Sequence, residues 1–492
     1  MFKLRALSLM TIIALLLLTA VVAVGQHEGG GGVTSDSATS SDAGRGSVRI
    51  RRAPTRPTAV RRPAAPVRRG ITAEQYNQQG DTLFTAEQYD EALEAYNKAV
   101  QLKPIASAFY HLGWIYNERE EYDQAVTALQ QSLRLTPKNA DAFYELGFAY
   151  RNLKRYDDAL LAFAGTITLD ATKTRAYYEI GWIYNEKKLY AQAVQPLRQA
   201  ITLQPNYAEA HSELGFTYRK LDRYQEAIAA YRQSIAAKAD YASPYFGLGD
   251  VYFYHTSQYP EAIRAYNSAL AIQPDNATAN YNVGWSYNEL KQFPQAVSAL
   301  QRAVEQKADY PEAYAELGFA YRKLEQFDAA LRSYNAAIRL KPDYAQPYFG
   351  LGDLYYYNLS RYEDAITAYR QALRLKPNNA AANYNVGWSL NDLNRNDEAV
   401  APLREAVRLK PEYAEAYQEL GYAYLKTQRY NEAVSSFNEA VRIKPDYGLA
   451  YYNLGITYLA VNDKRKANDQ YRILQRIDQD RANKLSALIN KR

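Results

Sequence analysis

The sequence has 492 residues, an ordinary apolar content of 47%, no cysteine and a formal net charge of +6. Residues 26–72 hold nine arginines and three acidic residues, whereas residues 73–492 hold 48 basic and 50 acidic residues, so the positive charge does not indicate a nucleic-acid-binding body. The lack of cysteine excludes a disulfide scaffold, a cysteine–zinc site and a lipid-anchored cysteine.

A secretory signal peptide is predicted over residues 1–25. Lys3 and Arg5 precede an apolar run, and Ala23 and Gly25 form a small-x-small cleavage pattern. An uncleaved membrane anchor is the alternative, but the apolar run is short for a span of roughly 20 residues. We therefore expect cleavage after Gly25, no membrane span in the mature chain, and a bacterial protein that is periplasmic or secreted from the cell.

Residues 26–72 are predicted to be a disordered linker. A glycine run is followed by Ser, Thr and Asp, and then by arginine alternating with proline and alanine from Arg49 to Arg69. Such a segment has no apolar face to bury. Two interpretations are open: a cationic tether to an anionic part of the cell envelope, or a solvated spacer.

Residues 73–480 consist of about twelve copies of one repeat. A glycine recurs every 33 to 35 residues from Gly80 to Gly455, an alanine usually follows it by twelve residues, and a proline often ends the repeat. The apolar spacing is that of two short amphipathic helices, and the small residues mark their crossing. One helical hairpin cannot bury its apolar face, so neighbouring hairpins must stack. The fold class is therefore an all-α solenoid.

The repeats resemble the tetratricopeptide repeat (TPR) family over residues 73–480. One repeat carries the family pattern as Leu146, Gly147, Tyr150, Tyr156, Ala159 and Phe163. The resemblance implies a right-handed superhelix of about 12 helix-turn-helix repeats, whose first helices line a concave groove that usually binds proteins or peptides. Residues 481–492 are expected to form a C-terminal capping helix.

The residue after each repeat glycine divides the repeats into three classes. By the family resemblance, this residue faces the groove, as do the residues four before, three after and four after it. The predicted groove residues of the tryptophan class are Tyr110, Trp114, Asn117, Glu118, Tyr178, Trp182, Asn185, Glu186, Tyr281, Trp285, Asn288, Glu289, Tyr384, Trp388 and Asn391. Those of the phenylalanine class are Tyr144, Phe148, Arg151, Phe216, Arg219, Lys220, Phe319, Arg322 and Lys323. Those of the aspartate class are Asp250, Tyr254, Asp353 and Tyr357.

Two hypotheses account for the acidic and basic side chains that alternate along this groove. In the first, neighbouring repeats pair with each other; the candidate pairs are Glu118 with Arg151, Glu289 with Arg322, Asp250 with Arg219, and Asp353 with Arg322. In the second, aromatic shelves and charged groups hold an extended peptide. The aspartate repeats also carry one extra residue, which we place in the turn between the two helices.

The tryptophans have three possible roles: gripping a peptide, stacking on a sugar ring, or packing between adjacent first helices. The groove hypothesis predicts that all four are partly exposed. The arrangement of three-repeat blocks, which recurs after 103 residues, suggests duplication of whole blocks.

No catalytic or metal-binding motif is found, and the four histidines lack metal-ligand spacing. We expect no enzyme activity and no cofactor. The leading hypothesis is an extracytoplasmic scaffold that binds protein or peptide partners. The alternatives are a structural protein that stacks end to end into fibres or a surface layer, and a carbohydrate-binding or cell-wall-binding protein.

Overall fold

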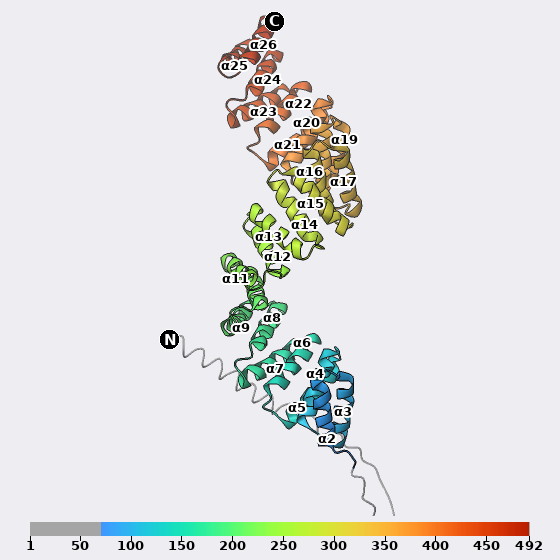
Figure 1. The fold of residues 1–492 in the computed structure, drawn as a ribbon. Coiled ribbons are helices and arrows are strands. Elements are labelled where there is room, and N and C mark those ends of the chain that lie inside the picture. Colours follow the sequence, from blue (N-terminus) through green and yellow to red (C-terminus); the bar gives the residue numbers. More distant parts are fainter. Residues whose placement is uncertain (1–69, 492) are drawn as a thin grey trace, which may run out of the picture. The chain divides into compact units, whose positions relative to one another are not determined.

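The computed structural model describes residues 70–491, which contain 25 α-helices and no strand (Figure 1). The predicted signal peptide and almost all of the predicted linker lie outside these residues. The chain divides into two compact sections, residues 1–205 and 206–492. We call them the N-terminal and C-terminal sections and describe each by itself. Among the described residues, each helix is too short or too polar to cross a membrane.

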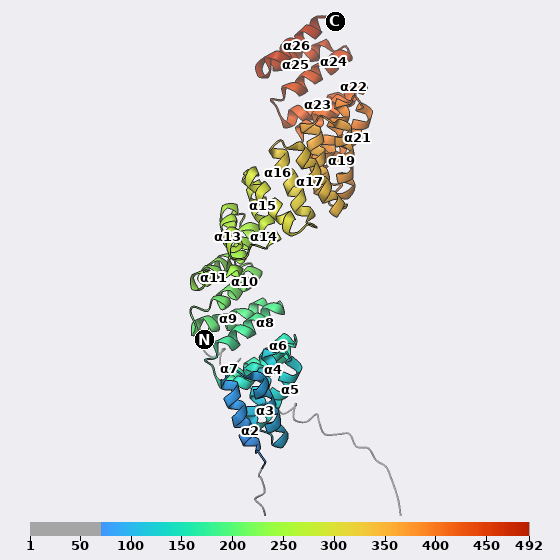
Figure 2. The same cartoon turned by 45° about the vertical axis from the view of Figure 1, so that its right-hand side comes forward.

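Four helical hairpins, repeats 1 to 4, make up the described part of the N-terminal section. Their helices are α2 Ala73–Thr85, α3 Tyr89–Leu102, α4 Ala106–Glu118, α5 Tyr122–Leu135, α6 Ala140–Asn152, α7 Tyr156–Leu169, α8 Thr174–Glu186 and α9 Tyr190–Leu203. Within each repeat the two helices lie side by side, and each hairpin packs on the next (Figure 2). The repeat boundaries agree with the glycine period.

The C-terminal section contains repeats 5 to 12 and one further helix. Its helices are α10 Ala208–Lys220, α11 Tyr224–Ala237, α12 Ala242–Asp250, α13 Tyr259–Ile272, α14 Ala277–Glu289, α15 Phe293–Gln306, α16 Pro311–Lys323, α17 Phe327–Leu340, α18 Ala345–Asp353, α19 Tyr362–Leu375, α20 Ala380–Asp392, α21 Asn396–Leu409, α22 Ala414–Lys426, α23 Tyr430–Ile443, α24 Gly448–Ala460, α25 Lys464–Ile477 and α26 Gln479–Lys491. The π-helical segments η1 Val251–His255 and η2 Leu354–Asn358 directly extend α12 and α18.

The repeat glycine allows the two helices of a hairpin to approach closely. A methyl group on Gly181 would lie 2.5 Å from Leu197, and one on Gly147 would lie 2.7 Å from the ring of Phe163. The facing side chain comes from the second helix and is almost fully buried in repeats 1 to 11. In repeat 12, Gly455 instead faces Leu485 of α26, so this last helix covers the end of the array.

Each turn between the two helices contains a residue with positive φ that is not glycine. Twelve residues have φ between 52° and 62°, one in each repeat, and they include Glu120, Lys154 and Ser257. In repeat 2 the backbone N–H groups of Glu120 and Glu121 donate to Asn117 and Tyr116, which satisfies carbonyl groups at the end of α4. A side chain in this conformation costs roughly 1–2 kcal/mol relative to the right-handed region.

The extra residue of the aspartate repeats lies in the first helix, so its predicted position in the turn is wrong. In repeat 6, Ser257 has the positive φ and α13 begins two residues later, the same spacing as from Glu120 to α5. The turn therefore keeps its length. The additional residue widens the last turn of the first helix into the π-helical segment η1, and η2 repeats this in repeat 9.

Candidate partner-binding surface

The asparagines of the tryptophan repeats, predicted to face a ligand, instead connect neighbouring repeats. The Asn117 amide donates to the backbone oxygen of Glu145 at 3.0 Å and to its carboxylate at 2.8 Å. Asn288 and Asn391 make the same two bonds to residues of the following repeat, Glu316 and Glu419. All three asparagines are only 4% exposed, and Asn185 is buried as well. They are therefore closed to a partner in this structure.

The arginines of the phenylalanine repeats occupy the same position and also reach the following repeat. Arg151 pairs with Glu179 at 2.7 Å and Arg219 pairs with Asp250 at 2.8 Å. The guanidinium carbon of Arg151 also lies 4.9 Å from the ring centre of Phe148. Burial raises the pKa of the Glu179 carboxyl above its ordinary value, and the nearby Arg151 opposes part of this rise.

Two of the proposed charge pairs are confirmed and two are wrong. Arg219 with Asp250 and Arg322 with Asp353 are as predicted, the second at 3.3 Å. The proposed pairs of Glu118 with Arg151 and of Glu289 with Arg322 are wrong, because each arginine extends forward to the next repeat rather than back to the previous one.

In the aspartate repeats, the π-helical turn shifts this inter-repeat contact by one residue. The Tyr254 hydroxyl donates to the Asn282 amide oxygen at 3.2 Å. The Asn282 amide donates to the Tyr266 hydroxyl at 3.0 Å, and that hydroxyl donates to Asp250 at 2.7 Å. With Arg219, these residues form a continuous polar network across repeats 5, 6 and 7.

An equivalent network crosses repeats 8, 9 and 10. Tyr357 donates to Asn385 at 3.2 Å, Asn385 donates to Tyr369 at 3.0 Å, and Tyr369 donates to Asp353 at 2.7 Å. Arg322 completes it. The pattern of the repeats indicated the aspartates and Tyr254 and Tyr357, but not the other tyrosines or the asparagines. Their constant spacing of 16 residues was the available signal.

The four tryptophans are half-buried, as the groove hypothesis predicts. Each lies against an aromatic ring of the preceding repeat. The ring-centre distances are 4.9 Å for Phe84–Trp114, 6.3 Å for Tyr156–Trp182, 5.0 Å for Phe253–Trp285 and 5.0 Å for Tyr356–Trp388. The tryptophans therefore pack between repeats and also present part of their surface.

The residue four positions after each tryptophan is an exposed acid, and the residue four positions after Phe216, Phe319 or Tyr422 is an exposed lysine. Glu118, Glu186 and Glu289 are exposed in the tryptophan repeats. The Trp285 indole N–H donates to Glu289 at 3.3 Å. In the phenylalanine repeats, the ammonium groups of Lys220 and Lys323 each lie 5.5 Å from the ring centre of Phe216 or Phe319. These acids and lysines are the predicted groove charges that stay accessible.

The tyrosines that lie four residues before the tryptophan or phenylalanine of a repeat are half-buried or buried. Burial, followed by the nearby Glu145 carboxylate, raises the pKa of Tyr110 to about 12. Burial and Glu179 raise the pKa of Tyr144 to about 12. The remaining members are Tyr178 and Tyr281, which are half-buried, and Tyr384, which is buried. At neutral pH, Tyr110 and Tyr144 remain protonated and can act as hydrogen-bond donors.

Three glutamates that the sequence analysis missed lie two residues before the repeat glycine. Glu145, Glu316 and Glu419 are each bonded to an asparagine of the preceding repeat, and burial raises the pKa of each carboxyl. The hydrogen bond from the asparagine opposes this shift. The signal in the sequence was the constant separation of 28 residues between asparagine and glutamate.

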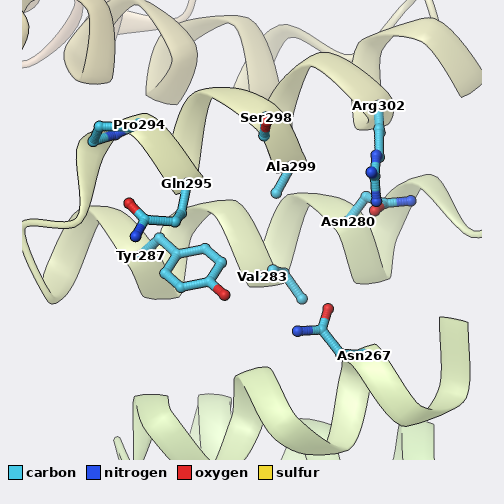
Figure 3. Close-up of a pocket in the computed structure, with 9 residues that line it drawn as sticks. All are labelled: Asn267, Asn280, Val283, Tyr287, Pro294, Gln295, Ser298, Ala299 and Arg302. Carbon is cyan, nitrogen blue, oxygen red and sulfur yellow. The ribbon is translucent and has the colours of Figure 1, made fainter. Parts of the chain in front are cut away.

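A polar cavity of about 390 Å³ opens between α13, α14 and α15 (Figure 3). At two other junctions, a glutamine in the second helix of one repeat donates to the hydroxyl of a tyrosine in the first helix of the next repeat, 20 residues later. Gln301, for example, donates to Tyr321 of repeat 8 at 2.9 Å, and the same bond occurs in repeat 3. The corresponding residue before Tyr287 is the shorter Asn267, which makes no such bond. The recess is left open between these two side chains (Figure 3).

Repeat models match most of the chain between residues 73 and 448. Models described as TPR repeat match residues 113–154, 181–222, 215–255 and 320–358. Models described as tetratricopeptide repeat match residues 354–414, 387–448, 255–318, 73–105 and 141–169. No curated protein matches the sequence.

Several solved structures are similar to this chain. MamA protein is 24% identical over 35% of this chain and 94% of its own, with a TM-score of 0.33. YrrB, described as a TPR protein with an unusual peptide-binding site, is 22% identical over 38% of this chain and 97% of its own, with a TM-score of 0.35. Yeast Tom70 is 17% identical over 85% of this chain and 94% of its own, with a TM-score of 0.33.

Proposed function

Because this chain belongs to the tetratricopeptide repeat family, whose repeats typically serve as protein–protein interaction scaffolds, we propose that it is an extracytoplasmic scaffold that binds protein or peptide partners. Tetratricopeptide repeats are generally non-catalytic, and we include that in the proposal. Among residues 70–491, no three histidine or acidic side chains are grouped to hold a metal ion.

The observation that carries the proposal is the set of exposed charges beside half-buried rings. The inter-repeat contacts occupy the asparagines and arginines, but leave a charged group beside a ring in repeat after repeat. In the C-terminal section these are Lys220 and Lys323 beside phenylalanine, Glu289 beside tryptophan and Lys426 beside Tyr422. Ring surface with an adjacent charge suits a peptide, which offers both apolar side chains and charges.

Affinity capture with the full chain tests this role. We expect the triple variant Lys220→Glu, Lys323→Glu and Lys426→Glu to capture at least ten-fold less partner protein than the wild type. The matched control reverses three exposed arginines of second helices, Arg332, Arg339 and Arg404, with the same change in net charge. Equal capture by both variants would show that these rings and lysines do not form the binding surface.

The extracytoplasmic setting is supported only by the signal-peptide pattern of residues 1–25. Fractionation of cells that express the full chain, with N-terminal sequencing of the product, tests it. We expect a product that begins after Gly25 outside the cytoplasm. An uncleaved product in the cytoplasmic fraction would remove this part of the proposal and leave the scaffold role standing.

Carbohydrate binding is a second candidate because of the cavity beside Tyr287. Asn267, Gln295, Ser298 and Arg302 line the same cavity and offer hydrogen-bonding groups to the hydroxyl groups of a sugar. Calorimetric titration with cell-wall oligosaccharides tests it, and the absence of heat with both the wild type and Tyr287→Ala would exclude it.

Stacking into fibres is less well supported, because α26 covers the last repeat and buries Leu485.

A further inference from the structure

Tyr254 and Tyr357 are the two exposed aromatic side chains among residues 70–491, with 54% and 53% of their surfaces open. Every other tyrosine, phenylalanine and tryptophan in this range is buried or half-buried. Both lie in π-helical segments, which are rare and often occur at functional sites. The exposure therefore belongs to one type of site that occurs twice in the C-terminal section.

Each exposed ring is held in place by its neighbours. The hydroxyl of Tyr254 is bonded to Asn282, which is fully buried, and its ring centre lies 4.6 Å from that of Phe253 in an edge-to-face contact. Tyr357 has the same contacts with Asn385 and with Tyr356, at 4.8 Å. A partner that packs on such a ring does not have to order it first, which favours binding.

An exposed acid of the next repeat lies close to Tyr357. Tyr356, which contacts Tyr357, donates to the exposed Asp392 at 2.8 Å. The ring centre of Trp388 lies 6.4 Å from that of Tyr357. We call Tyr357, Trp388 and Asp392 the Tyr357 subsite.

The Tyr254 subsite consists in the same way of Tyr254, Trp285 and Glu289. Phe253, which contacts Tyr254, has its ring centre 5.0 Å from that of Trp285, and the indole N–H of Trp285 donates to Glu289. Within residues 70–491, neither Glu289 nor Asp392 forms an ion pair. Each subsite therefore presents an exposed ring and a carboxylate without a cation.

Elsewhere in the array, a ring and a carboxylate together hold an arginine of the chain itself. Arg151 lies 4.9 Å from the ring centre of Phe148 and 5.3 Å from that of Trp182, and it pairs with Glu179. Arg219 and Arg322 are held in the same manner, by the rings of Phe216 and Phe319 and the carboxylates of Asp250 and Asp353. A planar guanidinium group can stack on a ring and pair with a carboxylate at the same time.

Repeats 6 and 9 carry no such arginine towards the repeat that follows them. Its position, four residues after the repeat glycine, holds Phe253 in repeat 6 and Tyr356 in repeat 9. The arginines of the preceding junctions, Arg219 and Arg322, are already paired with aspartates. A guanidinium group at the Tyr254 or Tyr357 subsite would therefore come from another molecule.

We propose that the Tyr254 and Tyr357 subsites each bind an arginine side chain of a partner protein. The guanidinium group stacks on the exposed tyrosine and pairs with Glu289 or Asp392. This rests on the proposed role in binding protein or peptide partners and names the side chain that is recognised. Lysine suits the subsites less well, because its compact ammonium group cannot stack as a plane.

The spacing of the two subsites sets the spacing of the arginines. Both subsites lie in the C-terminal section, three repeats apart, and successive first helices at the usual packing distance put them roughly 24–30 Å apart. Eight residues of extended chain span about 26–29 Å. One extended segment with two arginines eight residues apart can therefore occupy both subsites, and the second contact strengthens the first.

Fluorescence anisotropy with designed peptides tests the recognition of arginine. The probe is a fluorescein-labelled glycine–serine peptide with two arginines eight residues apart, titrated into the full chain. We expect at least ten-fold weaker binding when both arginines are replaced by citrulline, which keeps the shape without the charge, and at least three-fold weaker binding with two lysines. Failure of the two-arginine peptide to bind, or equal binding of the citrulline peptide, would overturn the proposal.

Variants of the full chain test the location. Tyr254→Ala with Tyr357→Ala should weaken binding at least ten-fold, whereas Tyr254→Phe with Tyr357→Phe keeps both rings and should bind like the wild type. Glu289→Gln with Asp392→Asn should also lose at least ten-fold.

The matched control for the acids changes two exposed carboxylates of second helices, Glu305→Gln with Asp328→Asn, and should leave the affinity unchanged. If the alanine variant does not fold, the acid variant and its control decide the result. Unchanged affinity of the acid variant, or an equal loss in the control, would refute the assignment. Self-association of the chain that Tyr254→Ala with Tyr357→Ala abolishes, without binding of the peptide, would assign the surface to a second copy and also overturn the proposal.

The outcome is separable from that of the scaffold proposal. If the lysine triple variant loses captured partners while no form of the chain binds the two-arginine peptide, the scaffold role stands and the assignment of arginine is wrong. If the wild type captures no partner protein but binds the peptide as described, the subsites recognise arginine and the scaffold proposal fails.

Discussion

Replacement of Tyr266 by phenylalanine removes one hydroxyl from the centre of the network across repeats 5, 6 and 7. The ring itself is tolerated, because Phe163 and Phe437 occupy the equivalent position in other repeats. They are fully buried and lie as close to their repeat glycines as Tyr266 does to Gly249. The effect of Tyr266→Phe therefore reports on the hydroxyl alone.

The structure sets the size of that effect. The hydroxyl donates to the Asp250 carboxylate at 2.7 Å and accepts from Asn282, which is fully buried. Loss of a hydrogen bond to a charged group costs about 1.5–3 kcal/mol, and a buried amide without a partner costs about 1–3 kcal/mol. Because the two losses share one site and do not add fully, we expect roughly 2–4 kcal/mol of local destabilisation.

Hydrogen exchange measured by mass spectrometry is the suitable assay, because repeat arrays need not unfold in one step. Amides of α12 to α14 should exchange roughly 30- to 1,000-fold faster in Tyr266→Phe, since about 1.4 kcal/mol corresponds to ten-fold. The equivalent helices α18 to α20, with Tyr369 intact, provide the control within the same molecule. Exchange that rises by less than three-fold, or equally in both regions, would refute the reasoning.

Three other variants test the turns, the helix crossing and the buried carboxyls. Lys154→Gly should stabilise the chain by about 0.5–1 kcal/mol in urea unfolding, because glycine relieves the positive φ, whereas Lys98→Gly inside an exposed helix should lose about 1 kcal/mol. Gly181→Ala should cost about 1–3 kcal/mol by overpacking Leu197, with Gly70→Ala, which meets no atom within 4 Å, unchanged in the same assay. Because burial raises the pKa of Glu419, its protonated form is favoured in the folded state, and stability is lost as pH rises through that pKa. Glu419→Gln should therefore be more stable than wild type at pH 7, and the gain should shrink towards pH 4; a constant difference would contradict the raised pKa.

The repeat boundaries were predictable because each hairpin needs a small residue at its crossing, and this requirement recurs at a fixed interval. The pairs of Arg219 with Asp250 and of Arg322 with Asp353 were predictable because opposite charges meet at one repeat junction. The asparagines were misplaced for a physical reason. A family pattern shows which helix face a residue occupies, but not whether its amide extends outwards or forward into the next repeat.

Two further features lay beyond a repeat pattern. The extra residue of repeats 6 and 9 can be accommodated by a longer turn or by a wider helix. The spacing of residues in the sequence is the same in both cases. The positive φ of the turn residues was also hidden, because lysine, glutamate, serine or glutamine occupies it in nine of the twelve repeats in place of the glycine, asparagine or aspartate that usually marks this conformation. Only the backbone geometry distinguishes these cases.

The two polar networks also have a mechanical consequence. Each ties three consecutive hairpins through side chains that are shared across both junctions, so the middle hairpin cannot separate without breaking contacts to both neighbours. Under tension, such a segment should yield as one block of about 103 residues, which releases roughly 35 nm of extended chain. Independent hairpins would instead give steps of roughly 12 nm. Repeats 5 to 10 would then contain two stiff three-hairpin segments, with the Asn288–Glu316 contact between their polar networks.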